Sequence, residues 1–189
     1  VTVDLHAGQI QGFFDIPVDN LFSTPIFARH AKKKIKSDKI ICVAPDVGGT
    51  ERARALGKLL NVGLAIVDKR RPKPGQSQVM NVIGEVKGRT CIIVDDIIDS
   101  GGTIVNAAKA LKSRGAKEVY VYITHGVLSG DAVKKIKNSV IKNLVITDTI
   151  DNISKTKNVK NIEVLSISAL MGEAIKRISN STSVSDLFK

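Results

Sequence analysis

A short segment near the middle of the chain, Cys91–Thr103, places the strongest constraint on the fold. The apolar run Cys91–Val94 is typical of a strand that is buried on both faces of a parallel sheet. Two adjacent carboxylates, Asp95 and Asp96, follow this run, and a glycine-rich turn then leads into residues with helical spacing. This order of elements predicts an α/β protein with a site at the end of the strand.

Strand-like runs alternate with helix-period segments along the rest of the chain, which predicts a doubly wound parallel sheet flanked by helices. The strand-like runs are 39–44, 63–67, 90–94, 118–124, 143–147 and 161–166. The helix-period segments are 24–36, 49–60, 103–114, 130–139 and 168–179. Polar side chains follow four of the predicted strands, at the edge where ligands of such sheets bind. These side chains are Asp46, Lys69, Asp95 and His125.

The turn Asp99–Thr103 has the composition of a phosphate-binding loop. Its two glycines let backbone N–H groups approach an anion, and the hydroxyls of Ser100 and Thr103 are further donors. The dipole of the following helix also favours negative charge. The carboxylates before the turn can accept hydrogen bonds from vicinal sugar hydroxyls, so the segment predicts a ribose 5-phosphate site. The alternative is an ordinary acidic turn between a strand and a helix.

The net charge of +11 is compatible with nucleic-acid binding. Three observations oppose it: the lysines are scattered, the aromatic residues are only five Phe and two Tyr, and no RNA- or DNA-binding motif is present. No apolar run approaches the roughly 18 to 20 residues that span a bilayer. Cys42 and Cys91 each fall in a predicted buried strand, as reduced core residues would. We therefore expect a cytoplasmic protein with neither a nucleic-acid nor a membrane partner.

The segment 68–78 is basic, contains two prolines and has no apolar anchor. This composition predicts a long exposed connection that becomes ordered only with a ligand. Its three consecutive basic residues, Lys69, Arg70 and Arg71, would place positive charge beside the phosphate site, as phosphoryl transfer requires. The alternative is a solvated surface loop.

The first nineteen residues contain three carboxylates and one imidazole, which are Asp4, His6, Asp15 and Asp19. Carboxylate oxygens suit Mg²⁺, and a histidine in the set is compatible with a loosely held metal or with orienting a phosphate. We expect His30 and His125 to be structural or to support residues of the site, and we assign neither a catalytic role. The chain starts at Val1, inside a strand-like run, so we expect it to be a piece of a longer protein.

Five blocks of the sequence resemble one known family. The blocks are Asp4–Asp19, Pro45–Gly49, Lys69–Pro72, Asp95–Thr103 and Ser183–Phe188. Together they are similar to the phosphate-activated, hexameric class of ribose-phosphate pyrophosphokinases, also called PRPP synthetases. The resemblance implies a phosphoribosyltransferase-like fold. It also implies transfer of pyrophosphate from ATP to the anomeric hydroxyl of ribose 5-phosphate, which gives PRPP and AMP for nucleotide biosynthesis.

The resemblance also implies a role for each matching residue. Ribose 5-phosphate would be bound by Asp95, Asp96, Asp99, Ser100, Gly101, Gly102 and Thr103. Lys69 and Arg71 would be catalytic, because they would stabilise charge on the transferred group, with support from Arg70. Mg²⁺ would be held by His6, Asp46, Asp4, Asp15 and Asp19. An activating phosphate or ADP would be bound by Gln11, Asp19, Asn20, Ser183, Ser185 and Phe188.

The family's two-domain layout implies a division of the chain. Residues 1–21 would be a remnant of the N-terminal domain, 22–179 the C-terminal domain, and 180–189 a tail packing on the N-terminal domain. Full-length members would form a homohexamer, and this fragment alone would be inactive. Two alternatives are a phosphoribosyltransferase that uses PRPP and a non-catalytic protein associated with the synthetases. The blocks Asp4–Asp19 and Lys69–Pro72 disfavour the first, and an intact Lys69, Arg71 and Asp95–Thr103 disfavour the second.

Overall fold

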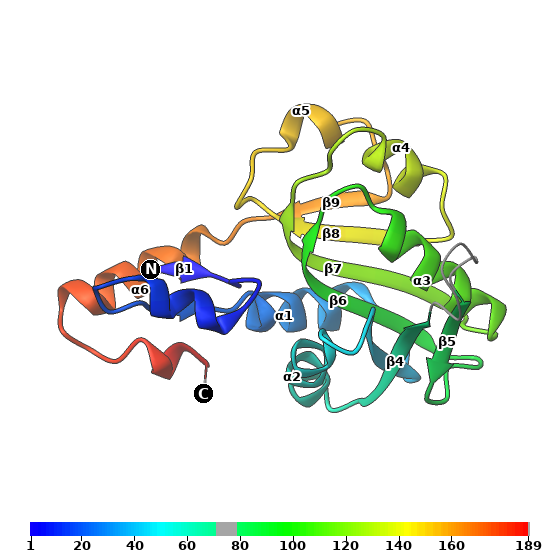
Figure 1. Cartoon of the computed structure of the whole chain (residues 1–189), viewed down its shortest axis with the longest axis horizontal. Coiled ribbons are helices and arrows are strands. Elements are labelled where there is room, and N and C mark those ends of the chain that lie inside the picture. Colours follow the sequence, from blue (N-terminus) through cyan, green and yellow to red (C-terminus); the bar gives the residue numbers. More distant parts are fainter. Residues whose placement is uncertain (71–78, 189) are drawn as a thin grey trace.

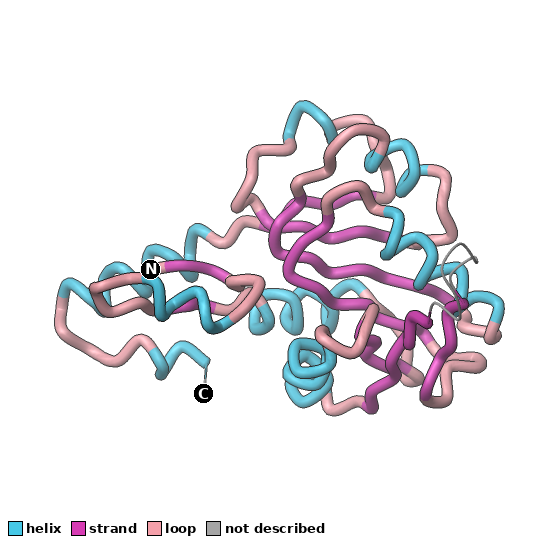
Figure 2. The backbone as a smooth tube through the Cα atoms, in the orientation of Figure 1, coloured by secondary structure: helices cyan, strands magenta, loops and turns pink. Residues whose placement is uncertain are grey.

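The structure is a computed structural model that describes residues 1–70 and 79–188 (Figures 1 and 2). The strands of this part are β1 (Thr2–Val3), β2 (Asn20–Leu21), β3 (Ile40–Ala44), β4 (Gly63–Arg70), β5 (Val79–Ile83), β6 (Thr90–Ile98), β7 (Glu118–Gly126), β8 (Asn143–Thr147) and β9 (Ile162–Leu165). The α-helices are α1 (Thr24–Lys34), α2 (Thr50–Leu60), α3 (Gly102–Ser113), α4 (Ala132–Lys137), α5 (Ile153–Thr156) and α6 (Ser168–Ser179). Two 3₁₀-helices are η1 (Gly8–Phe13) and η2 (Ser185–Phe188).

Seven strands form one sheet in the order β5-β4-β3-β6-β7-β8-β9. All neighbours are parallel except β4 and β5, which form an antiparallel pair at one edge. The chain leaves β3 through α2 toward β4, and it leaves β6 through α3 toward β7, on the other side of β3. Right-handed crossovers in opposite directions require helices on opposite faces, so the predicted doubly wound architecture is confirmed.

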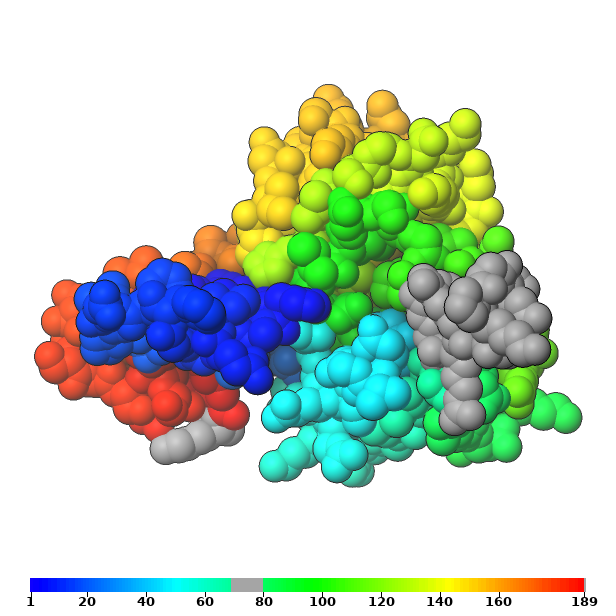
Figure 3. All heavy atoms as spheres, in the orientation of Figure 1, coloured from blue at the N-terminus to red at the C-terminus, as the bar shows by residue number. Residues whose placement is uncertain are grey.

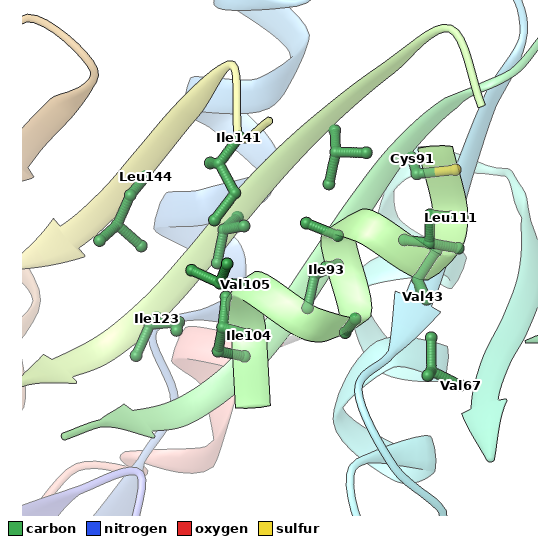
Figure 4. Close-up of a cluster of buried hydrophobic side chains, with 14 of the residues drawn as sticks. Val43, Val67, Cys91, Ile93, Ile104, Val105, Leu111, Ile123, Ile141 and Leu144 are labelled. Atoms are coloured by element: carbon green, nitrogen blue, oxygen red, sulfur yellow. The ribbon is translucent and has the colours of Figure 1, made fainter. Parts of the chain in front are cut away.

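Both faces of the sheet are buried, because successive side chains of each strand point to opposite sides. On one face Cys42 and Val94 pack with residues of α1 and α2, including Phe27 and Leu56. On the other face the packing partners come from α3 and α4. Figure 4 shows part of this second cluster, in which the labelled side chains are Val43, Val67, Cys91, Ile93, Ile104, Val105, Leu111, Ile123, Ile141 and Leu144.

The two cysteines lie on neighbouring strands but in different clusters, Cys42 on the α1 and α2 face and Cys91 on the α3 and α4 face. Both are free thiols, and burial raises the pKa of each to about 12. They are therefore the inert core residues that the sequence predicts.

The two ends of the chain lie together, away from the sheet. Figure 1 shows β1 and η1 beside α6 and the C-terminal turn, and Figure 3 shows the two ends in contact at one end of the molecule. The rings of Phe22 and Phe188 meet edge to face, with their centroids 5.7 Å apart. Strands β1 and β2 form a separate parallel pair here. We call β1, η1, β2, α6 and η2 the small lobe.

The strand bounds differ from the sequence prediction in several places. β6 and β7 continue past the predicted ends, since their pairing runs to Ile98 and Gly126. β4 extends to Arg70 because it pairs with β5, a strand that the sequence analysis did not predict. Within the strand-like run at the start of the chain, only Thr2–Val3 is extended in a ladder. Among the described residues, no helix is both long and apolar enough to cross a membrane.

Candidate functional site

The carboxyl ends of β3 and β6 form the switch point of the sheet, where connections leave in opposite directions. Open α/β sheets bind ligands at this position. Asp46 follows β3, while Asp95 and Asp96 lie within β6 rather than after it. The extra length of β6 comes from its pairing with β7, which continues through both acids.

An arginine from α2 pairs with both acids of β6. Arg52 Nη1 lies 2.9 Å from Asp95 Oδ1 and 3.2 Å from Asp96 Oδ1. The backbone N–H of Asp96 also donates to Asp95 Oδ1, at 3.0 Å. The sequence analysis did not identify Arg52, since it lies 43 residues from Asp95 and no motif joins them. The one feature of the sequence that pointed to Arg52 was its position in the first turn of α2, the helix that follows the loop after β3.

His6 completes this group from the N-terminal segment. Its Nδ1 lies 2.8 Å from Asp96 Oδ2, although the two residues are 90 positions apart. The His6 side chain is 78% exposed and that of Asp96 is 3% exposed. The imidazole therefore extends over the buried acid and faces solvent, where a ligand can reach it.

The pKa values of the two acids are shifted in opposite directions. Burial, reinforced by the neighbouring Asp96, raises the pKa of Asp95 to about 7 against the opposing charge of Arg52. Burial also acts to raise the pKa of Asp96, but hydrogen bonds with Asp95 and His6 and the charge of Arg52 outweigh it and hold that pKa below its ordinary value. Near neutral pH the pair thus holds one firmly ionised carboxylate beside one that exchanges a proton.

The predicted phosphate loop joins β6 to α3. Asp99 and Ser100 are exposed, and α3 begins at Gly102 with no capping side chain among the described residues. Gly101 has a left-handed backbone (φ 75°), and a Cβ there would face Ala132 and Ile136 of α4. A Cβ at Gly102 would meet nothing within 4 Å. The open face of the loop therefore lies at Gly102 and the exposed Thr103, where the helix N-terminus can receive an anion.

Lys135 of α4 is a second residue that the sequence analysis did not identify. Its Nζ donates to the carbonyl of Ser100 at 3.1 Å. This contact places a cation on the loop itself, next to the predicted anion site.

The acids predicted to hold metal are dispersed. Asp46 is exposed, and its Oδ1 accepts the N–H of Gly49 at 2.9 Å. Asp15 and Asp19 are exposed on the N-terminal segment, whereas Asp4 is buried. Within residues 1–70 and 79–188, no three His, Cys, Asp or Glu side chains converge as a metal cluster.

The predicted activator residues fall into two groups. A pocket of about 360 Å³ lies between the chain ends and is lined by Val18, Asp19, Asn20, Phe22, Val184, Ser185 and Phe188. Four of the six predicted residues line it. The side chain of Gln11 instead donates to Gly8, and the carbonyl of Ser183 accepts from Arg177.

Of the two predicted catalytic residues, Lys69 has a described backbone position. The backbone of Lys69 lies in β4, opposite Met80, and Arg70 lies opposite Val79. Arg71 lies outside the described residues, as does the rest of the connection to residue 78. His30 and His125 have structural partners, namely Tyr122 and Glu163 for His30, and Thr149 and Val3 for His125.

Comparison with known proteins gives a consistent result. A family profile described as "Phosphoribosyl synthetase-associated domain" matches residues 69–189. The ribose-phosphate pyrophosphokinase of Rhizobium meliloti is 58% identical over 188 residues, which are 100% of this chain and 61% of that protein. The enzyme of that name from Hyphomonas neptunium is 59% identical over 189 residues, with the same two coverages.

A solved structure shows the same fold. The phosphoribosylpyrophosphate synthetase from Mycobacterium smegmatis superposes with a TM-score of 0.85 at 36% identity, over 95% of this chain and 58% of that one. The chain thus spans about three fifths of the length of the curated relatives it matches. Since the profile covers more than half of its residues, the chain belongs to the phosphoribosyl synthetase-associated domain family and is homologous throughout to ribose-phosphate pyrophosphokinases.

Proposed function

We propose that this chain is the C-terminal part of a ribose-phosphate diphosphokinase, which converts ATP and ribose 5-phosphate into PRPP and AMP in the cytoplasm. The observation that supports this most strongly is the group formed by His6, Arg52, Asp95 and Asp96 next to the uncapped N-terminus of α3. The carboxylates would accept the sugar hydroxyls, and the helix N-terminus after the loop that follows β6 would bind the phosphate, as ribose 5-phosphate requires.

The sugar would lie across the switch point of the sheet. Its 5-phosphate would accept N–H donors at Gly102 and Thr103, with the hydroxyl of Ser100 and the charge of Lys135 nearby. Its vicinal hydroxyls would donate to Asp95 and Asp96. Arg52 and His6 hold these carboxylates in place before the sugar arrives, which lowers the entropic cost of ordering them.

In the transfer, the anomeric oxygen forms a bond to the β-phosphorus as the bond to the α,β-bridging oxygen breaks. AMP leaves with that oxygen, and the proton of the anomeric hydroxyl is released to solvent. The protein's part is alignment and charge neutralisation. We assign the neutralisation to Lys69 and Arg71, because the matching block of the sequence is basic and Lys69 lies on β4, beside β3.

Mg²⁺ would fit the site if phosphate oxygens of the substrate supplied part of its ligands. The donors that face solvent are the exposed His6, the exposed Asp46 and the partly exposed Asp95, without a cluster of three metal-capable side chains in the described ranges. Mg²⁺ commonly keeps several waters and binds one or two carboxylates plus substrate phosphates, which suits this sparse set. When bound, it would neutralise charge on the phosphates.

The pocket of the small lobe is the proposed regulatory site. Asp19, Asn20, Ser185 and Phe188 line it, and we propose that phosphate or ADP binds there. The same proposal treats residues 1–21 and the tail 180–189 as parts that pack in the N-terminal half of the complete enzyme, which would assemble as a homohexamer.

Binding of ribose 5-phosphate to the purified chain tests the site. In the Gly102→Val variant the added side chain enters open space at the loop, so it should block the phosphate without straining the backbone. Gly172→Val is the matched control, because it places valine on α6 where a Cβ also meets nothing within 4 Å. Calorimetry should show binding for the wild type and the control and loss of binding for Gly102→Val.

Equal affinity in all three proteins would contradict the assignment. Gly101→Val is a poorer test, since its left-handed backbone would be strained and its side chain would point at α4. A phosphoribosyltransferase would share the ribose 5-phosphate site, so an assay for PRPP consumption with free bases separates the two functions. A non-catalytic associated protein would bind the sugar but never complete a turnover, even in the full-length protein.

A further inference from the structure

Asp4 differs from the other acids of the N-terminal segment because it is buried, at 4% exposure. Its Oδ2 accepts two hydrogen bonds, from the N–H of Ser23 at 2.9 Å and from Thr124 Oγ1 at 2.6 Å. Its backbone N–H donates to Leu21 at 2.8 Å. The carboxylate therefore joins the N-terminal segment to the start of α1 and to β7.

The backbone of Asp4 is left-handed, with φ of 44°. Asn and Asp adopt this conformation several times more often than other residues with a side chain. The position thus selects a short polar side chain for its backbone as well as for its contacts.

Two further contacts fix the residues on either side. His125 of β7 contacts the carbonyl of Val3 through Nε2 at 2.9 Å, and its Nδ1 contacts Thr149 Oγ1 at 3.0 Å. The side-chain oxygen of Asn20 accepts the N–H of Leu5 at 3.2 Å. Three consecutive residues before His6 are therefore anchored to the body of the protein.

The anchoring matters because His6 has little else to hold it. Its side chain is largely exposed, and the imidazole contacts Asp96. A displacement of about 1 Å in such a group can cost a reaction about 10²-fold. The position of the imidazole over Asp96 is thus set by the backbone that Asp4 secures.

We propose that Asp4 is a positioning residue, which secures the N-terminal segment on β7 so that His6 stays on Asp96, and that it is not a metal ligand. This inference rests on the proposed function, because it takes the His6–Asp96 pair as part of the reaction site. Asp4 is 4% exposed and its Oδ2 already accepts two donors, so this carboxylate is committed to the protein's own backbone and side chains and is poorly placed to hold a hydrated ion.

Two substitutions separate positioning from metal binding. In Asp4→Asn the amide oxygen can still accept both hydrogen bonds and the left-handed backbone is tolerated, but the negative charge is lost. In Thr124→Val one donor is lost while the charge of Asp4 stays, and the fully buried site keeps a side chain of similar size. Asp4→Ala removes both the contacts and the charge.

NMR spectra of the imidazole rings in the 189-residue chain measure the outcome. The chain contains three histidines, so few ring signals have to be assigned. Spectra are recorded at one fixed pH, before and after addition of Mg²⁺ alone. Asp4→Ala and Thr124→Val should shift the His6 ring signals away from their wild-type positions, and Asp4→Asn should leave them in place. The ring of His30, which is bonded to Tyr122 and Glu163, serves as an internal control for the fold.

Unshifted His6 signals in both Asp4→Ala and Thr124→Val would overturn the proposal. So would a complete loss of the Mg²⁺ response in Asp4→Asn together with a normal response in Thr124→Val, as expected for a ligand. If Asp4→Ala does not fold, Thr124→Val decides. A wild-type protein with the expected His6 pattern but no affinity for ribose 5-phosphate would contradict the proposed function and leave the positioning role intact.

Discussion

Arg52 Nη1 lies 2.9 Å from Asp95 Oδ1, so a side chain from the first turn of α2 reaches across the switch point to the acids of β6. Both side chains are about one-fifth exposed. The pair connects the two crossovers that leave the sheet in opposite directions. It sets the charge balance of the site, because the same guanidinium also contacts Asp96.

Removal of this guanidinium should destabilise the protein. Arg52→Ala leaves two adjacent carboxylates without their cation, at a cost of about 1–3 kcal/mol in the free energy of unfolding. The exposed Arg54 on the same helix provides the matched control, and Arg54→Ala should change stability little. Urea unfolding of the three proteins measures the difference.

The same variant has a pH dependence with a defined sign. Asp95 has a pKa near 7 in the folded protein against an ordinary value of 3.8, so its contribution to stability falls as pH rises between these values. A protonated Asp95 has less need of a cation. The destabilisation by Arg52→Ala should therefore be larger at pH 8 than at pH 5, and an equal destabilisation at the two pH values would show that Arg52 acts through packing alone.

Glu163 should contribute to stability in acid. Burial alone would raise its pKa, but hydrogen bonds from Lys34, Asn143 and His30 outweigh it and lower the pKa below the ordinary value of 4.5. A lowered pKa gives stability that is present above pH 4.5 and is lost as pH falls further. Acid unfolding of Glu163→Gln should therefore depend less on pH in this range, while Asp15→Asn, at an exposed carboxylate, behaves as the wild type.

The contact between Phe22 and Phe188 should hold the C-terminal turn on the small lobe. Edge-to-face pairs contribute about 0.5–1.5 kcal/mol beyond their buried area. Phe188→Ala should therefore increase the rate of proteolysis within residues 180–188. Phe13, which is 85% exposed, is the control, and Phe13→Ala should leave that rate unchanged.

Local sequence signals predicted much of the fold. The bounds of β8 and α6 match the predicted segments, because an apolar run and a helical period are properties of neighbouring residues. β5 was missed because its pairing with β4 is set across a connection rather than by its own composition. β6 was predicted too short because the ladder with β7 extends it past its apolar run.

In the candidate site too, residues within one continuous segment were predictable from the sequence, whereas contacts between distant segments were not. Asp95, Asp96 and the loop to Thr103 form one continuous segment, so their proximity was predictable. Arg52 was not, since its contact spans 43 residues between two elements. The different surroundings of Asp4 and Asp15 were equally hidden, because burial depends on how the N-terminal segment packs on β7. A motif places acids in sequence but does not say which of them face solvent.

The last prediction is that the 189-residue chain makes no PRPP by itself although it folds. Both core clusters are complete around the seven-stranded sheet, so folding and binding of ribose 5-phosphate should be retained. Turnover also requires ATP aligned in line with the anomeric hydroxyl, and a misplacement of about 1 Å can cost 10²-fold. The chain covers only 61% of its relatives, and the proposed remainder supplies that alignment. A coupled assay of AMP release, with Mg²⁺ and phosphate present, should show no turnover while calorimetry on the same sample shows binding. Turnover at about 1 per second or faster, in the usual range of enzymes, would mean that the site is complete within this chain.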